Sequence, residues 1–296
     1  MIGDAADVVV TGYASLDVAL HATRLATGAQ TALLTGAVNP PARDGGCGPN
    51  VARILARLGV PTALLSWVGD DADGIAYRDR LVADGVDVRG VESGPGPSPR
   101  SILVYDPSGE AACYFHPAGS RHQRLSSAAM DLVRRAAWIV VTVGPPELTA
   151  EVLDAARPDA RIAWGLKADP VSFTPELCRR LAPADLICLN RAELAFVEAQ
   201  LRIDAGSGID ALRQSGAGWV AVTRGAAGWT LHGEATVSGT AEGVDVGDPT
   251  GAGDAFFAGL IAARVTGRAP DEAGGFAASV AARVLRGELA AGEVVA

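Results

Sequence analysis

The segment with the clearest chemical signal runs from Asp248 to Gly259 and reads DPTGAGDAFFAG. Gly251, Ala252 and Gly253 stand at the start of a predicted helix, where open backbone N–H groups and the helix dipole would attract an anion. Asp254 follows in the first helical turn. Its carboxylate would repel a resting phosphate but could accept a proton from a hydroxyl that attacks a phosphoryl group. The ordinary alternative is a tight glycine turn before a helix that begins with a favourable acid.

A second glycine-rich segment, GGCGPNVA, begins at Gly45. Gly45 and Gly46 lie in the irregular stretch Gly36–Gly48, and a stretch of that length predicts a loop beside a ligand. Taken locally, Asn50 would cap a helix predicted over Asn50–Leu58.

Three weaker motifs each have an ordinary structural explanation. Asp17, in GYASLD, would by itself be a solvated loop acid. Asn190 and Glu193, in NRAE, have the spacing of a capping box at a helix start. The segment TRGAAG, from Thr223 to Gly228, follows a predicted strand and is equally consistent with the turn of a hairpin.

The elements that must position these residues alternate between two kinds. Short apolar runs predict buried strands at Val8–Thr11, Thr62–Val68, Trp138–Thr142, Arg161–Trp164, Leu186–Leu189 and Trp219–Thr223. Amphipathic stretches between and after them predict helices at Asn50–Leu58, Asp73–Asp84, Ser126–Ala136, Leu148–Ala156, Ala192–Ala199, Ile209–Gln214, Ala252–Thr266 and Asp271–Leu285. This alternation predicts an α/β fold with a doubly wound, mainly parallel sheet that is covered on both faces.

One segment interrupts the alternation. Ser101–Tyr105 and Glu110–Phe115 are two β runs joined by the turn-forming sequence DPSG. The pair predicts a hairpin, and a hairpin inside an α/β chain indicates a small additional sheet. Strand alternation places Tyr114 and Phe115 on opposite faces of this hairpin.

Composition excludes several classes of protein. The net charge of -9 argues against binding to nucleic acid or to an anionic membrane surface. Lys167 is the only lysine beside 24 arginines, and it is not preceded by glycine, so there is no P-loop. The four cysteines form no Cys-x-x-Cys pair, and the longest apolar run, 136–143, is too short to span a bilayer. We therefore expect a reduced, cytoplasmic protein.

The two glycine-rich segments together resemble the ribokinase-like (PfkB-type) carbohydrate and nucleoside kinases. Asp248–Gly259 is similar to the C-terminal motif of that family, and the segment from Gly45 to Gly85 is similar to its N-terminal motif. The likeness extends from about Val8 to about Leu285. Two segments depart from it: Thr23–Pro41 has unusual spacing, and Arg286–Ala296 lacks a Gly-Ala segment that contributes to a monovalent-cation site in some members.

The resemblance implies a role for each motif. Asp254 would be the catalytic base, with an anion hole formed by Gly251, Ala252 and Gly253. The acceptor would be held by Asp17, Gly45, Gly46 and Asn50, because a carboxylate can accept hydrogen bonds from two adjacent hydroxyls. Mg²⁺ would be positioned through water by Asn190 and Glu193, and ATP would be bordered by Thr223, Gly225 and Gly228. Asp248 and Thr250 could contribute to a K⁺ site, although the departure at the C-terminal end argues against K⁺ dependence.

The implied activity is ATP-dependent transfer of the γ-phosphoryl group to a hydroxyl of a small sugar. The resemblance implies one ribokinase-like domain over residues 1–296, with a small β-sheet lid formed by about 12–45 and 87–117. An exposed hairpin is marginal by itself, so we expect the lid either to close over bound substrate or to pair with a second chain in a homodimer.

Other acceptors and one other class of function stay open. A ribonucleoside of the adenosine or cytidine type would be favoured if Tyr105, Tyr114 or Phe115 stacks on a base. A phosphorylated or carboxylated sugar would need a cation such as Arg43 or Arg100. A non-catalytic regulator that binds a sugar or nucleotide on the same fold is the alternative of another class, and the intact Asp254 argues against it.

Overall fold

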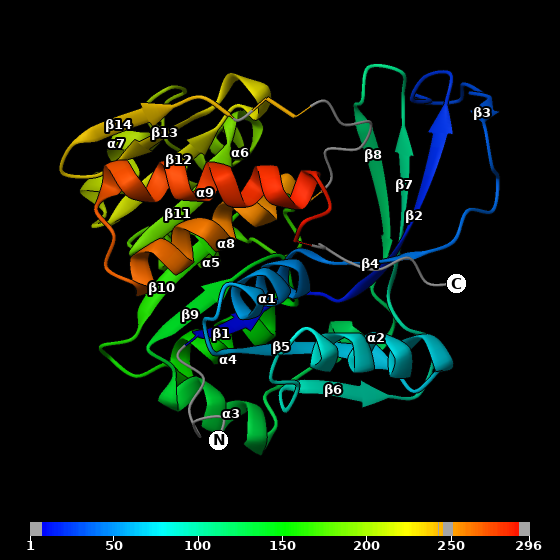
Figure 1. The fold of residues 1–296 in the computed structure, drawn as a ribbon, viewed down its shortest axis with the longest axis horizontal. Helices are drawn as coiled ribbons and strands as arrows, with labels where there is room; N and C mark the ends of the chain where they lie inside the picture. The colour runs from blue at the N-terminus through cyan, green and yellow to red at the C-terminus, as the bar shows by residue number, and fades with distance from the viewer. Residues whose placement is uncertain (1–7, 242, 245–250, 290–296) are drawn as a thin grey trace.

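The computed structural model describes residues 8–241, 243–244 and 251–289. It contains a nine-stranded sheet with helices on both faces and a separate five-stranded sheet. Figure 1 shows the small sheet standing beside the helix-covered body, with its strands at a steep angle to those of the large sheet. None of the helices in the described ranges combines the length and hydrophobicity that crossing a membrane requires.

The large sheet has the strand order β14-β13-β12-β11-β10-β9-β1-β5-β6. From β6 to β12 all neighbouring strands are parallel, and β13 and β14 extend this sheet as antiparallel strands. The strands are β1 (Val8–Thr11), β5 (Thr62–Gly69), β6 (Val91–Gly94), β9 (Trp138–Val141), β10 (Arg161–Gly165), β11 (Leu186–Asn190), β12 (Trp219–Thr223), β13 (Trp229–His232) and β14 (Thr236–Gly239). The doubly wound, mainly parallel sheet predicted from the sequence is confirmed.

Two hydrophobic cores cover the two faces of this sheet. Because strand side chains alternate, Val8 and Val10 of β1 enter one core and Val9 enters the other. The first core is covered by α1 (Cys47–Arg57), α2 (Ala72–Ala83), α8 (Ala252–Val265) and α9 (Pro270–Leu285). The second is covered by α3 (Ser127–Arg135), α4 (Pro146–Ala155), α5 (Pro175–Leu181), α6 (Arg191–Leu201) and α7 (Gly208–Gln214).

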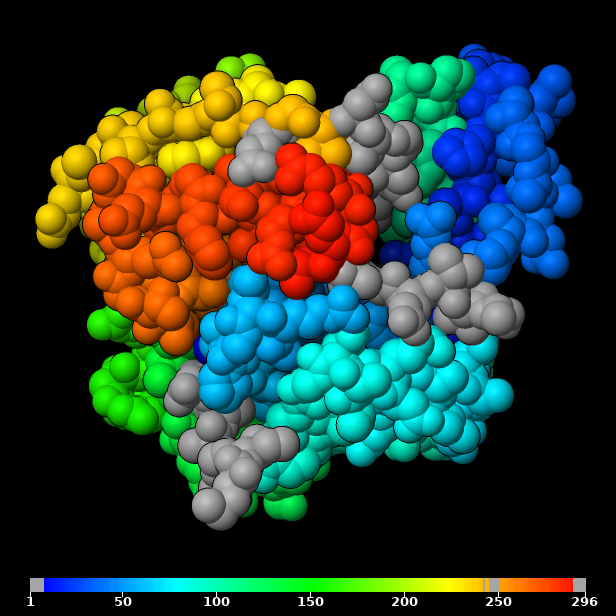
Figure 2. Space-filling model, in the orientation of Figure 1, coloured from blue at the N-terminus to red at the C-terminus, as the bar shows by residue number. Residues whose placement is uncertain are grey.

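The small sheet has the strand order β3-β2-β7-β8, and β4 also pairs with β2. Its strands are β2 (Ser15–Ala22), β3 (Leu34–Thr35), β4 (Arg43–Gly45), β7 (Arg100–Tyr105) and β8 (Ala111–His116). β2 and β7 are parallel, whereas the other neighbours are antiparallel. In the space-filling view this sheet stands out from the helices of the body (Figure 2).

Two expectations about this region need correction. The lid range 87–117 begins too early, because β6 pairs in parallel with β5 and so belongs to the large sheet. The stretch 36–48 is not one irregular loop either, since it contains β4 and the first residues of α1. β4 (RDG) and β6 (VESG) contain too few apolar residues to be recognised as strands in the sequence, and their pairing with long strands decides their conformation.

Candidate active site

Asp254 and Asn50 meet where α8 packs against α1. Gly251 is the N-cap of α8, and its φ of 85° is a conformation that favours glycine. This turn places Asp254 in the first turn of α8, where its carboxylate is half-buried. Asn50 donates from Nδ2 to Asp254 Oδ2 at 2.9 Å.

Asn50 is therefore not a helix cap. α1 begins at Cys47, three residues earlier than predicted, because Gly46 is its N-cap. Gly46 has a φ of 96°, and a Cβ built on it would lie 2.2 Å from the carbonyl oxygen of Tyr13. Only glycine fits this turn, and the turn places Asn50 inside the helix with its amide directed at Asp254.

The surroundings of Asp254 make its carboxylate more basic than that of an ordinary aspartate. Burial raises the pKa of Asp254. The Asn50 amide, the Lys167 ammonium and the Cys47 thiol favour its ionised form, but they do not cancel the effect of burial. A carboxylate with a raised pKa at the start of a helix is suited to accept a proton beside an anion-binding turn.

A second half-buried carboxylate, Asp17, lies on β2 of the small sheet. Ser15 donates from Oγ to Asp17 Oδ1 at 2.6 Å. A Cβ built on Gly45 would lie 2.0 Å from Asp17 Oδ2, so a glycine is required where the two strands meet. Burial raises the pKa of Asp17, and the nearby charge of Asp254 adds to the rise, which indicates that the two carboxylates share one site.

A buried ion-pair network holds the loop that contains Gly45 and Gly46. Asp44 is 5% exposed and accepts from Arg80 Nε at 2.8 Å and from Arg80 Nη2 at 2.6 Å. Arg53 of α1 also pairs with Asp44. Tyr77 of α2 donates its hydroxyl to the carbonyl of Gly45 at 2.6 Å. We call Asp44, Arg53, Arg80 and Tyr77 the loop brace.

Asn190 and Glu193 form a complete capping box at the start of α6. Glu193 N–H donates to Asn190 Oδ1 at 3.0 Å, and Asn190 N–H donates to Glu193 Oε2 at 2.7 Å. Burial raises the pKa of Glu193, while the Asn190 N–H and Lys167 oppose the rise. The bond to Asn190 N–H uses Glu193 Oε2, so Oε1 is the oxygen that could accept from water around a metal ion.

The described residues contain no cluster of three or more His, Cys, Asp or Glu side chains that could hold a metal directly. Mg²⁺ retains several waters and binds through one or two carboxylates together with substrate phosphates. Glu193 fits that mode of binding.

The segment from Thr223 to Gly228 lies beside the capping box. Thr223 is in register with Asn190 across β12 and β11. The chain then turns through Gly225 and Gly228, with φ values of 57° and 89°, before it returns as β13. A Cβ built on Gly228 would lie 2.1 Å from the carbonyl oxygen of Gly239. The turn is thus a hairpin, as one of the two interpretations predicted. Asp248 and Thr250 lie outside the described residues.

Lys167 belongs to this site although the sequence did not single it out as a site residue. It follows β10, and its ammonium interacts electrostatically with Cys47, Asp254 and Glu193. These neighbours raise its pKa, Cys47 contributing most, so it stays protonated at neutral pH. The one signal in the sequence was its position just beyond a predicted buried strand, as the only lysine in the chain.

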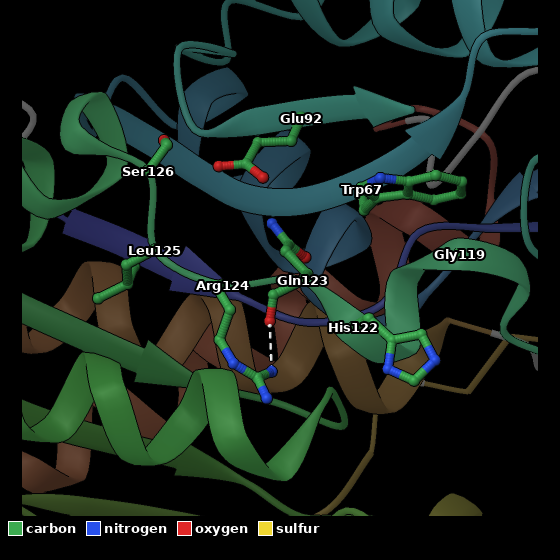
Figure 3. A pocket seen from close by; sticks show the side chains of 8 residues that line it. All are labelled: Trp67, Glu92, Gly119, His122, Gln123, Arg124, Leu125 and Ser126. Carbon is green, nitrogen blue, oxygen red and sulfur yellow. Dashed lines mark hydrogen bonds between the residues drawn. The ribbon is translucent and has the colours of Figure 1, made fainter. Parts of the chain in front are cut away.

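A cavity of about 390 Å³ lies elsewhere (Figure 3). None of the expected site residues lines it; its walls are formed by Trp67, Glu92, Gly119, His122, Gln123, Arg124, Leu125 and Ser126. Trp67 lies close to Gly94 and Gly119, where a Cβ would come within 3.2 Å and 2.7 Å of its ring. Gly94 ends β6 shortly before the chain enters the β7–β8 hairpin, and Gly119 follows that hairpin, so the cavity lies where the hairpin joins the body.

The sequence matches the profile described as pfkB family carbohydrate kinase over residues 5–293. The chain belongs to the pfkB family. This membership confirms the resemblance inferred from the two glycine-rich segments, and it confirms that the protein is a kinase of the carbohydrate and nucleoside kinase family.

Relatives of this pfkB-family kinase are named for different substrates. The chain is 27% identical to a nucleoside kinase of Methanothermobacter thermautotrophicus, with 82% of this chain and 79% of the relative covered. It is 30% identical to an ATP-dependent ribose-1-phosphate kinase of Halopiger xanaduensis (88% and 85% covered) and 31% identical to a fructokinase of Klebsiella pneumoniae (83% and 85% covered).

Solved structures confirm the fold of this kinase. A nucleoside kinase of Methanocaldococcus jannaschii, described as an archaeal member of the ribokinase family, superposes with a TM-score of 0.78 at 18% identity, covering 96% of this chain and 93% of that chain. A ribokinase of Cryptococcus neoformans in complex with ADP also gives 0.78, at 21% identity, with 95% and 94% covered.

Proposed function

We propose that this kinase transfers the γ-phosphoryl group of ATP to a hydroxyl of a small sugar. The observation that carries the proposal is the convergence of Asp254 of α8 with Asp17 of the small sheet, two carboxylates whose charges interact. One lies in the first turn of α8, where backbone N–H groups can bind a phosphoryl group. The other lies on the small sheet, where it can accept hydrogen bonds from vicinal hydroxyls.

In the proposed reaction, Asp254 is the base that activates the acceptor hydroxyl. As the acceptor oxygen attacks the γ-phosphorus, Asp254 takes the hydroxyl proton, and Asn50 keeps the carboxylate oriented through its 2.9 Å hydrogen bond. The N–H groups of Gly251, Ala252 and Gly253 bind the phosphoryl oxygens at the helix N-terminus. Mg²⁺, held by the phosphates and by water bound to Glu193, would neutralise part of their charge when bound.

Recognition of the acceptor falls to Asp17 and the loop from Gly45 to Gly46. Asp17 already accepts from Ser15 through Oδ1, so its remaining lone pairs can accept from two adjacent hydroxyls. Arg100 is less suited to bind an acceptor phosphate, because it already pairs with Asp73 of α2. We favour an uncharged sugar, and Arg43, which is in register with Asp17 across β4 and β2, is the cation that a phosphorylated acceptor would need.

A ribonucleoside is the second candidate, and one observation favours it. Phe115 lies on the same face of the small sheet as Asp17, because Asp17, Ser101 and Phe115 are in register across β2, β7 and β8. Its ring is 4.9 Å from that of Tyr13, so the two rings could form one wall of a base-binding site. Tyr114 is 63% exposed on the opposite face and cannot contribute.

We further propose that the small sheet pairs with a second copy of this chain. Leu34, Ile102 and Tyr114 project from the face opposite Asp17 and are 48%, 45% and 63% exposed. Apolar side chains gathered on one face of an open sheet indicate an interaction surface.

The test of function is a coupled assay of ADP release with ribose, fructose, adenosine, cytidine and inosine as acceptors. Turnover with a sugar and none with the nucleosides would support the first candidate, and the reverse would establish the second. Binding of a sugar or nucleotide without ADP release, in protein shown to be folded, would instead support a regulator. The variant Asp254→Asn tests the site itself and should lose turnover with every acceptor.

A further inference from the structure

Lys167 lies at the carboxyl edge of the large sheet, two residues beyond the end of β10. The N–H of Leu166 donates to the carbonyl of Cys188 at 3.1 Å, so β10 stays beside β11 as far as this edge. β11 leads directly into α6, whose first turn contains Glu193. Lys167 therefore lies next to the end of the site that we assign to the nucleotide phosphates.

The end of β10 also lies against α8. A Cβ built on Gly165 would come within 2.4 Å of Phe257, so glycine at this position lets the helix approach the strand closely. Phe257 lies about one helical turn after Asp254, and this contact places the proposed base near the same edge of the sheet. The charge of Lys167 interacts with Asp254, with Glu193 and with Asp17. Its ammonium therefore interacts both with Glu193, on the nucleotide side of the proposed site, and with Asp254 and Asp17, on the acceptor side.

Two further observations indicate that Lys167 binds a ligand rather than stabilising the fold. Within the part of the chain that the structure describes, no carboxylate lies within 4.0 Å of its ammonium, and the residue is exposed. The chain also uses arginine for 24 of its 25 basic residues, and its one lysine is at this site. A compact ammonium that pairs with no carboxylate among the described residues is suited to meet an oxygen anion that arrives with a substrate.

We propose that Lys167 contacts the γ-phosphoryl group during its transfer and is a further catalytic residue of this kinase. This inference rests on the proposed function, in which Asp254 and Glu193 flank that group. In the step, the acceptor oxygen bonds to the γ-phosphorus while the bond to the β–γ bridging oxygen breaks. The acceptor proton goes to Asp254, and ADP leaves with the bonding electrons. Lys167 keeps its proton and donates hydrogen bonds to the equatorial oxygens, which carry the negative charge of the group in transfer.

The kinetic test compares Lys167→Gln with Lys167→Arg, and uses Arg134→Gln on α3 as a matched exposed-cation control. We expect Lys167→Gln to lower kcat by about 10²–10³, as removal of one transition-state donor does elsewhere. The KM of the acceptor should change by less than about three-fold, since the contact forms with the transferred group. Lys167→Arg should recover part of the loss, and Arg134→Gln should behave as the wild type.

Three results would overturn the inference. The first is an unchanged kcat in Lys167→Gln. The second is a raised acceptor KM with kcat unchanged, which would assign Lys167 to acceptor binding. The third is a circular dichroism spectrum that shows loss of fold in both Lys167 variants. Loss of turnover in Asp254→Asn beside full turnover in Lys167→Gln would reject only this inference, whereas full turnover in Asp254→Asn would reject the proposed function.

A second readout uses the fact that Lys167 is the only lysine. Acetylation by an N-hydroxysuccinimide ester, followed by peptide mass spectrometry, would report its accessibility, with the α-amino group as internal reference. ADP, Mg²⁺, aluminium fluoride and acceptor together mimic the group in transfer. We expect this mixture to protect Lys167 strongly, and acceptor alone to protect it little. Equal labelling with and without the mixture, or full protection by acceptor alone, would contradict a contact with the phosphoryl group.

Discussion

The carboxylates of the site are held in an environment that opposes their charge. Burial raises the pKa of Asp17, Asp254 and Glu193, and in each case the neighbouring donors only partly oppose this effect. A raised folded-state pKa means that ionisation costs folding stability above the unfolded-state pKa. The ionised carboxylate of Asp254 is the form that can act as a base, and it destabilises the fold. Such an opposition between activity and stability is common at active sites.

The variant Asp254→Asn tests both sides of this relation. The amide cannot accept the proton, so kcat should fall by about 10²–10⁴. It also removes a charge that burial disfavours, so the free energy of unfolding at neutral pH should rise, on the order of 1 kcal/mol. The gain should shrink as the pH falls and vanish below the ordinary aspartate pKa of 3.8, where the wild-type carboxyl becomes protonated in both the folded and the unfolded state. Urea denaturation at several pH values measures it, and lower stability of the variant at neutral pH would contradict the argument.

Asp17 and Phe115 separate a sugar from a nucleoside. Both acceptors present vicinal hydroxyls, so Asp17→Ala should raise the acceptor KM by about 10- to 150-fold, from the loss of a charged hydrogen-bond partner. For a sugar, Phe115→Ala and Tyr105→Ala should change KM far less. Tyr105 provides an internal comparison, because its ring packs at 5.8 Å from His21 rather than on Tyr13. A large KM rise in Phe115→Ala, with Asp17→Ala still impaired, would make the nucleoside the leading acceptor.

The loop brace joins α1 and α2 to the strand β4 that ends at Gly45. Asp44 has no exposed side-chain surface, and Arg53 is 1% exposed. Removing Asp44 leaves the buried Arg53 with Asp84 as its remaining ion-pair partner, so Asp44→Ala should cost about 3 kcal/mol of unfolding free energy, the low end for a broken buried pair. Urea denaturation would measure the loss. Asp159→Ala breaks an exposed pair with Arg157 and should cost far less, because solvent screens that pair. Similar losses in the two variants would show that the brace does not stabilise the loop.

The sequence predicts those helices and strands whose bounds depend on local residue patterns. The sequence predicts the bounds of the six buried strands to within one residue, because each is a mostly apolar run covered on both faces. The predicted start of α1 is too late, because the helix begins after Gly46, whose φ of 96° and close approach to the Tyr13 backbone are tertiary features. β13 and β14 were missed because their apolar patterns are short.

In the candidate site, too, the sequence predicts local features but not contacts between distant residues. The motif positions of Asp254, Asn190 and Glu193 identify helix starts, which are local features, and the structure places them there. The hydrogen bond from Asn50 to Asp254 joins residues that are 204 positions apart, so no local pattern predicts it. Lys167 was missed for the same reason, since its position near two carboxylates follows from strand order and not from its neighbours in the sequence.

The small sheet has one face toward the site, whereas on its other face Ile102 and Tyr114 stay exposed among the residues that the structure describes. Its outer face contains Ile102 and Tyr114, and its edges are β3 and β8. An open sheet with an apolar face and exposed edges is a site of association unless something covers it. A second copy meets this need with the same surface, because a two-fold interface places one patch against itself.

We therefore expect the protein to be a homodimer in light scattering coupled to size-exclusion chromatography. Ile102→Glu should shift it toward monomer, because a carboxylate on the outer face would have to be desolvated on pairing. Val82→Glu, at a 56% exposed apolar position on α2, is the matched control and should leave the dimer intact. The Ile102→Glu monomer should also show a raised acceptor KM, since Asp17 lies on the same sheet and pairing would hold that sheet in place. A wild-type monomer at all concentrations, or equal dissociation of both variants, would show that the outer face is not the dimer interface.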